Sequence, residues 1–64
     1  MKQEELIAKM REWHQAELKD AQSYKEAAKD ALELGYRHAH GVLMDIAHEE
    51  ETHANIIEHM LEKL

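Results

Sequence analysis

The second half of the chain carries an apolar stripe at helical spacing that two polar residues interrupt. Residues three or four positions apart lie on one face of a helix. The stripe from residue 39 onwards consists of Ala39, Leu43, Ile46, Glu50, His53, Ile57, Met60 and Leu64. A carboxylate and an imidazole on a core-facing stripe are costly to bury unless they are paired, neutralised or bound to a metal. Glu50 and His53 therefore require a chemical explanation.

The first half of the chain repeats this pattern with one acidic interruption. Its stripe consists of Leu6, Met10, Trp13, Glu17, Tyr24, Ala28 and Ala31. The two stripes predict two long amphipathic helices, over residues 2–34 and 38–63. Gly35, rather than Gly41, is expected to end the first helix, because glycine best suits the left-handed backbone just past a helix. Residues 35–38 then form a short turn, which makes the helices antiparallel neighbours.

The predicted fold is an all-α, two-helix antiparallel hairpin that occupies residues 1–64 as one unit. A hairpin of this size buries too little apolar surface to be stable alone, because the far side of each stripe stays in water. The chain has no cysteine, so it forms neither disulfides nor thiolate metal sites. Metal binding and self-association are the remaining sources of stability, and we expect both.

The charge balance narrows the classes of partner. The chain has 14 acidic and 8 basic residues and a formal net charge of -6. This charge argues against nucleic acid and anionic membrane surfaces as partners. No apolar run approaches the roughly 20 residues that cross a bilayer. The first five residues also lack the hydrophobic segment of a signal peptide. We therefore expect a cytoplasmic protein.

The polar interruptions form part of a longer pattern. It reads Glu17-x6-Tyr24-x10-Gly35-Tyr36-x13-Glu50-x2-His53-Ala54. Over about residues 10–62 this pattern resembles the first half of a rubrerythrin-type ferritin-like di-iron domain. It is also similar to the encapsulated ferritins, two-helix chains that complete their site by pairing. The resemblance implies Glu17 as a terminal or bridging ligand, Glu50 as a bridging carboxylate and His53 as a nitrogen ligand.

The same resemblance implies that the site needs two copies of the chain. Four-helix members of the family supply further ligands from two additional helices, which this chain lacks. A two-fold homodimer, or a higher homo-oligomer, would supply them and form a ferritin-like four-helix bundle. Four carboxylates balance two divalent ions, whereas without metal they repel one another. Two iron ions per dimer are therefore expected, and Mn or Zn also suit carboxylate and imidazole ligands.

Three residues near this pattern have two interpretations each. Asp20, one turn after Glu17, is either an additional acid beside the metal or a flank of the stripe. Glu49 either holds the partner's His53 through its second ring nitrogen or is a solvated charge. Tyr24 either donates a hydrogen bond to a ligand carboxylate or packs in the core.

The remaining histidines and the sulfur-containing residues are expected to lie outside the chemistry. The residues expected to pack are Trp13, Met10, Met44 and Met60. His38 and His40 are two positions apart and so cannot share a helix face, although in a loop they could chelate a metal weakly. The histidines expected on the surface are His14, His48 and His59.

These residues favour oxidation of Fe(II) by O2 or H2O2, with Glu17, Glu50 and His53 as ligands and catalytic residues. One alternative is a rubrerythrin-like peroxide reductase that uses an external electron donor. Another is a metal-free helical interaction module. Rubrerythrins usually carry a Cys-x-x-Cys relay domain, which has no counterpart here. Encapsulated ferritins carry a C-terminal targeting tail, whereas this chain stops at Leu64, so delivery to a shell is not expected.

Overall fold

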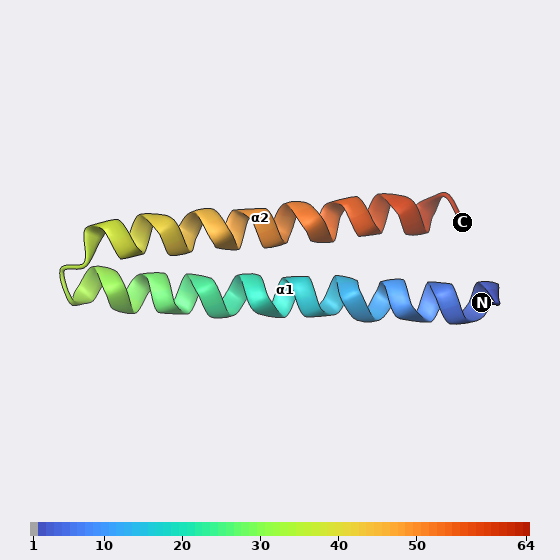
Figure 1. Cartoon of the computed structure of the whole chain (residues 1–64), viewed down its shortest axis with the longest axis horizontal. Helices are drawn as coiled ribbons and strands as arrows, with labels where there is room; N and C mark the ends of the chain where they lie inside the picture. Colours follow the sequence, from blue (N-terminus) through green and yellow to red (C-terminus); the bar gives the residue numbers. More distant parts are fainter. Residues whose placement is uncertain (1) are drawn as a thin grey trace.

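The computed structural model describes residues 2–64 and consists of two long helices, α1 (Gln3–Glu33) and α2 (Arg37–Glu62). The helices lie side by side and antiparallel, so the two termini meet at one end of the molecule (Figure 1). The hairpin is elongated, with extents of 49 × 14 × 13 Å. The prediction of an all-α, two-helix hairpin is confirmed, and each helix begins and ends within one residue of its predicted bounds.

The turn is built around Gly35, as predicted. Gly35 has a φ of +82°, in the left-handed region that favours glycine. The Tyr36 N–H donates to the Ala31 carbonyl at 2.8 Å, and the Gly35 N–H donates to the Leu32 carbonyl at 3.0 Å. These two bonds form a Schellman motif, which satisfies carbonyl groups that the end of a helix leaves free. Gly35 therefore fixes where α1 ends and how closely α2 follows.

A histidine ties the two helices together next to this turn. Nδ1 of His40 lies 2.8 Å from the Ala28 carbonyl oxygen. Because a carbonyl only accepts, Nδ1 carries the proton and donates it across the hairpin. His38 and His40 both lie in α2, which begins at Arg37, so neither lies in a loop. His40 thus has a structural contact in place of weak metal chelation.

Small side chains fill the space between the helices. Among residues 2–64, those that are buried are Met10, Ala21, Ala28, Ala31, Ala47 and Ala54. Ala21 and Ala28 on α1 lie seven residues apart, as do Ala47 and Ala54 on α2, and this interval corresponds to two helical turns, as in an antiparallel coiled coil. Alanine lets the two backbones approach closely, and the helices lie closer near the turn than near the termini (Figure 1).

The predicted stripe of α2 is displaced from the actual contact between the helices. The deepest residues of α2 are Ala47 and Ala54, each one position beyond a residue of the predicted stripe, Ile46 and His53. Large apolar side chains flank the alanines and face outwards. The exposed ones are Leu6, Trp13, Leu18, Leu32, Leu34, Tyr36, Val42, Ile56, Met60 and Leu64. A single hairpin therefore leaves most of its large apolar side chains in water.

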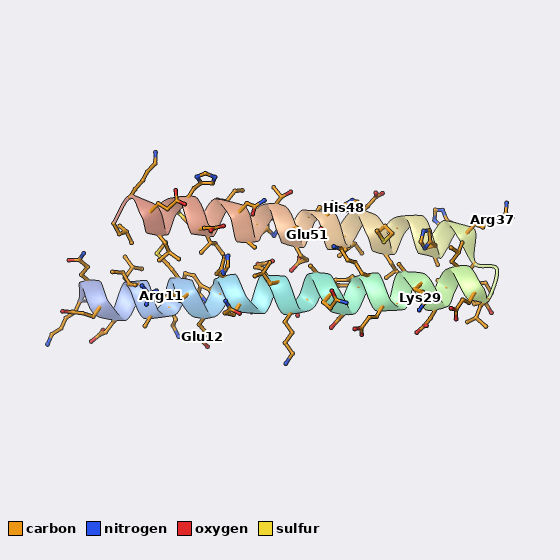
Figure 2. All side chains as sticks on the ribbon, turned by 180° about the vertical axis from the view of Figure 1, so that it is seen from behind. Arg11, Glu12, Lys29, Arg37, His48 and Glu51 are labelled. Carbon is orange, nitrogen blue, oxygen red and sulfur yellow. The ribbon has the colours of Figure 1, made fainter. Side chains whose placement is uncertain are left out.

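Charged residues cover the remaining surface. Glu12, Lys29 and His48 are exposed on the outside of the hairpin (Figure 2). The buried alanines between the helices, Ala21, Ala28, Ala31, Ala47 and Ala54, form what we call the alanine seam. Lys25 of α1 and Glu51 of α2 form an ion pair of 2.9 Å along one edge of this seam. Within the described chain, neither helix has an apolar stretch long enough to cross a bilayer.

The alanine seam gives a direct prediction for stability. Ala47→Leu should destabilise the hairpin by about 1–3 kcal/mol, because the added carbons must enter a closely packed space. Ala47 is completely buried, whereas Ala8 is exposed and supplies the matched control Ala8→Leu. Urea unfolding followed by circular dichroism measures both variants. An equal loss of stability in the two would show that the seam is not closely packed.

Candidate metal centre

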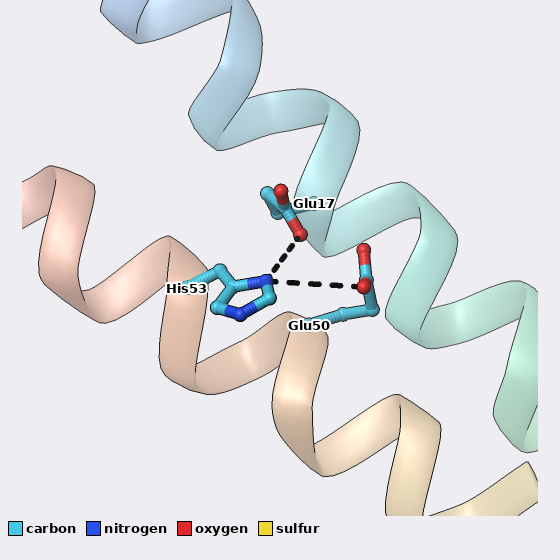
Figure 3. A group of neighbouring side chains, drawn as sticks. All are labelled: Glu17, Glu50 and His53. Carbon is cyan, nitrogen blue, oxygen red and sulfur yellow. Dashed lines mark ion pairs between the residues drawn. The ribbon is translucent and has the colours of Figure 1, made fainter.

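Three side chains with metal-binding atoms converge about halfway along the hairpin. Glu17 comes from α1, and Glu50 and His53 come from successive turns of α2 (Figure 3). Nδ1 of His53 lies 3.5 Å from Oε2 of Glu17 and 3.9 Å from Oε1 of Glu50. One ligand atom from each residue lies within 4.8 Å of the others. The structure thus brings together all three residues that the sequence pattern selects.

The burial of these side chains fits a metal site. The side chains of Glu17 and Glu50 are 25% and 20% exposed. Oε2 of Glu17 is buried and accepts no hydrogen bond within the described chain. A buried carboxylate oxygen without a donor is costly, and a bound cation would satisfy it. Two carboxylates and an imidazole are ligands that Fe, Mn and Zn accept.

The orientation of His53 indicates which ring nitrogen would bind. Nδ1 faces both carboxylates, whereas Nε2 points away from them (Figure 3). A neutral imidazole has one protonated nitrogen and one nitrogen with a free lone pair. Metal binding at Nδ1 therefore requires the proton on Nε2. The His53 side chain is 54% exposed, so this face of the site is open in a single hairpin.

The structure decides only in part between the two interpretations given for each of Asp20, Tyr24 and Glu49. Asp20 is exposed, but its charge acts on the carboxyl group of Glu50. Tyr24 is half-buried and forms no hydrogen bond with Glu17 or Glu50 among the described residues. Glu49 is exposed, and its contact with a partner histidine needs a second chain. The roles given to Tyr24 and Glu49 stay predictions.

The other histidines lie away from the three ligands. His48 and His59 are exposed, as expected, and His59 lies 3.7 Å from Glu62 on its own helix. The expectation that His14 lies on the surface is wrong. His14 is half-buried because it lies seven residues before Ala21, in the same row of the alanine seam.

The proximity of the two carboxyl groups changes the acidity of Glu50. Contact with the Glu17 carboxyl raises the pKa of Glu50, because a proton between the two groups can be shared. Partial burial and the negative charges of Glu17 and Asp20 raise this pKa further, while His53 lowers it. Glu50 therefore holds its proton more tightly in the folded protein than in the unfolded chain.

This shift predicts how the stability of the metal-free protein depends on pH. A carboxyl group with a raised folded-state pKa stabilises the fold at low pH, and this contribution is lost as pH rises through that pKa. The thermal midpoint of the metal-free protein should therefore rise as pH falls from 7 towards 4.5, the ordinary pKa of Glu50. Glu50→Gln should remove part of this rise, because the amide does not titrate. Superimposable pH profiles for parent and variant would contradict the shift.

No protein-family model, curated protein or solved structure matches the chain. The likeness to ferritin-like di-iron proteins therefore rests on the residues of the chain itself.

Proposed function

We propose that this protein binds iron through Glu17, Glu50 and His53 and oxidises Fe(II) with O2 or H2O2 at a site shared by two copies. The observation that carries the proposal is the convergence of these three side chains on one face of the hairpin. Carboxylate oxygens suit Fe(III) as well as Fe(II), and the imidazole adds a nitrogen ligand. A helical protein with charged residues between its helices but no metal site would not need two carboxylates and an imidazole at one point.

A homodimer supplies what one hairpin lacks. One chain offers two carboxylates and one imidazole, half of the set that di-iron carboxylate bundles use. A two-fold axis through the site doubles the set and forms a ferritin-like four-helix bundle. The surface area supports this pairing. The hairpin exposes 5045 Å², whereas a compact monomer of its mass would expose about 4,250 Å².

In this proposal the acidic side chains of the site bind the iron ions and attract further cations to it. Each Fe(II) substrate ion gives up one electron and becomes Fe(III), so a pair of ions, together with two protons from water, reduces one H2O2 to two waters or one O2 to H2O2. Glu17 and Glu50 bind and neutralise the cations, and Oε2 of Glu17, which accepts no hydrogen bond among the described residues, can bind a cation without breaking one. The negative charge of Asp20 attracts cations to the open side of the site.

Stopped-flow absorption tests the reaction directly. Anaerobic Fe(II)-loaded protein is mixed with O2 or with H2O2, and the formation of Fe(III) is followed. We expect a fast phase that oxidises about two irons per dimer, followed by slow turnover, because the chain has no cysteine relay for electrons. Glu50→Ala should lose the fast phase, whereas Glu58→Ala, an exposed position on the same helix, should keep it. Identical traces for parent, Glu50→Ala and protein-free buffer would contradict the proposal.

A metal-free interaction module is the second candidate, and the exposed large apolar side chains favour it. The two candidates differ in metal binding. Trp13 is the one tryptophan of the chain and lies one turn before Glu17, so its fluorescence can report binding nearby. Titration with Mn(II) should change this fluorescence and saturate at about one ion per chain, half of a two-metal site. Unchanged fluorescence, with no metal found by elemental analysis, would favour the module.

A further inference from the structure

The contact surface between the helices has the same short pattern on both sides. On each helix a half-buried histidine is followed, at seven-residue intervals, by two buried alanines. The members of this pattern are His14, Ala21 and Ala28 on α1, and His40, Ala47 and Ala54 on α2. Among residues 2–64 the other histidines are exposed. The two histidines that are partly withdrawn from water are therefore the two that begin this pattern.

Antiparallel packing arranges the repeated residues in layers. The contact between His40 and the carbonyl of Ala28 fixes the layer nearest the turn. From this layer both helices run to the same end of the molecule (Figure 1). A step of seven residues along each helix, about 10.5 Å, reaches a layer of two alanines. A second step of seven residues reaches His14 on α1 and Ala54 on α2. His14 thus lies level with Ala54, as His40 lies level with Ala28.

These layers are related by an approximate two-fold axis within the single hairpin. The middle layer consists of Ala21 and Ala47, and each layer beside it combines one histidine with one alanine. Rotation about an axis through the middle layer exchanges α1 and α2, and it carries His40 onto His14. The backbone that faces His14 is therefore equivalent to the backbone that faces His40.

The contact made by His40 shows what such a layer allows. Its Nδ1 donates a hydrogen bond to the Ala28 carbonyl oxygen at 2.8 Å. A carbonyl oxygen has two lone pairs, so it can accept this bond in addition to one from a helical N–H. Ala28 is completely buried, and its short side chain leaves the imidazole room to reach the backbone. Ala54 is also a completely buried alanine within a helix, so its carbonyl offers the same acceptor.

His14 has a donor that this acceptor would satisfy. It is half-buried, whereas its neighbours Trp13 and Gln15 are exposed, so its ring lies on the side of α1 that faces α2. Its side chain forms no hydrogen bond among residues 2–64. A polar group that is partly withdrawn from water is stabilised by a hydrogen-bond partner. The Ala54 carbonyl is the acceptor that the two-fold arrangement places opposite it.

This layer lies at the level of the proposed metal ligands. His14 precedes Glu17 by one helical turn, and Ala54 directly follows His53. A hydrogen bond between His14 and the Ala54 carbonyl therefore joins the helices within one turn of both ligands. The ligands of a metal site must be held to within about 0.5 Å of their binding geometry. The His53 side chain is 54% exposed, so its position opposite Glu17 depends mainly on the backbone of α2.

We propose that His14 donates a hydrogen bond from Nδ1 to the Ala54 carbonyl and thereby positions His53 opposite Glu17 for metal binding. This role rests on the metal site proposed above and adds a positioning residue from outside its ligand set. The bond links the ligand-bearing turns of the two helices, so its loss lowers metal affinity without removing a ligand.

Calorimetric titration with Mn(II) tests the role of His14. His14→Leu removes the ring donor but keeps a side chain of similar size. We expect this variant to bind Mn(II) about tenfold more weakly than the parent, the lower end of the range for residues that support a metal ligand. His14→Asn keeps an N–H close to the position of Nδ1 and should recover most of the affinity. Parental affinity in His14→Leu, or equal weakening in both variants, would overturn the proposal.

The equivalent histidine supplies a matched control. His40→Leu is the same substitution in the equivalent layer, and it removes a hydrogen bond that the structure contains. His40 lies about 20 Å from His53 along α2. Distant sites act independently, so His40→Leu should keep the Mn(II) affinity within about twofold of the parent. If His40→Leu lost as much affinity as His14→Leu, the effect would come from general stability, and the proposal would be wrong.

Nuclear magnetic resonance tests the hydrogen bond in the unaltered chain, loaded with diamagnetic Zn(II). Long-range proton–nitrogen correlation spectra report which ring nitrogen of each histidine carries the proton. The hydrogen bond that a ring makes determines this position, so we expect the proton on Nδ1 in both His14 and His40. His48 is exposed and should show a mixture of the two forms. A proton on Nε2 of His14 alone would overturn the hydrogen bond, whether or not the variants fold.

These measurements distinguish a failure of the positioning role from a failure of the proposed function. Stoichiometric Mn(II) binding with equal affinity in the parent and in His14→Leu overturns the role of His14 and leaves the iron site in place. Absence of Mn(II) binding by the parent overturns the iron site, and the positioning role with it.

Discussion

His53→Ala is expected to weaken Mn(II) binding by more than about 100-fold and to abolish rapid Fe(II) oxidation. Loss of a residue that only supports a metal ligand typically costs 10–100-fold in affinity, so loss of a direct ligand should cost more. Nδ1 of His53 is the one nitrogen that faces both carboxylates of the cluster. Mn(II) titration by calorimetry, with Trp13 fluorescence as a second signal, measures the change.

The chain offers good controls for this loss. His48 and His59 are exposed on the same helix and lie outside the cluster. His48→Ala and His59→Ala should therefore retain the affinity and stoichiometry of the parent. If His53→Ala retained them and a variant of His38 lost them, the metal site would lie beside the turn, and the proposed site would be wrong.

The convergence of the ligands was predictable because it depends on backbone geometry alone. Glu50 and His53 meet because residues three apart share a helix face. Glu17 and His53 are equally far from Gly35 in sequence, and an antiparallel hairpin brings such residues side by side. Once Gly35 is recognised as the turn, the pairing follows without any knowledge of packing.

The position of the alanine seam was less predictable, because the apolar pattern includes both the contact between the helices and the flanking surface of large apolar side chains. A pattern of hydrophobicity selects large residues such as Ile46 and Met60, which lie beside the contact between the helices. The closest contact between the helices uses Ala47 and Ala54, whose small size matters more than their hydrophobicity. Repetition of alanine at seven-residue intervals is the signal that identifies this seam.

The roles of Asp20, Tyr24 and Glu49, which lie near the ligands, depend on contacts that helical spacing does not determine. Asp20 acts on Glu50 through its charge, and this effect requires only that it lies one turn from Glu17. A hydrogen bond from Tyr24 depends on its rotamer. A contact from Glu49 depends on the placement of a second chain. Sequence spacing can identify these residues as candidates, but it cannot determine which contacts they form.

Glu17→Leu is expected to remove metal binding and at the same time to stabilise the metal-free protein. Oε2 of Glu17 is buried without a hydrogen bond, and the side chain lies beside the carboxyl group of Glu50. An unsatisfied buried polar group costs about 1–3 kcal/mol. Leucine removes this cost and the repulsion between the carboxylates. In a chain of this size, a gain of about 1 kcal/mol raises the thermal midpoint by roughly 4–8 °C.

Metal should reverse this order of stability. A ligand that binds only the folded protein stabilises it by about 2.7 kcal/mol at 100 times its Kd. With saturating Mn(II), the parent should therefore melt above Glu17→Leu, whose midpoint should not respond to the metal. Thermal melts at pH 7 with EDTA and with Mn(II) measure both effects, and Glu12→Leu, an exposed position on the same helix, controls for added apolar surface. A metal-free Glu17→Leu protein that melts several degrees below the metal-free parent would show that Glu17 stabilises the fold. In that case the carboxylate would have a structural role in the hairpin, and its buried oxygen would no longer indicate a metal site.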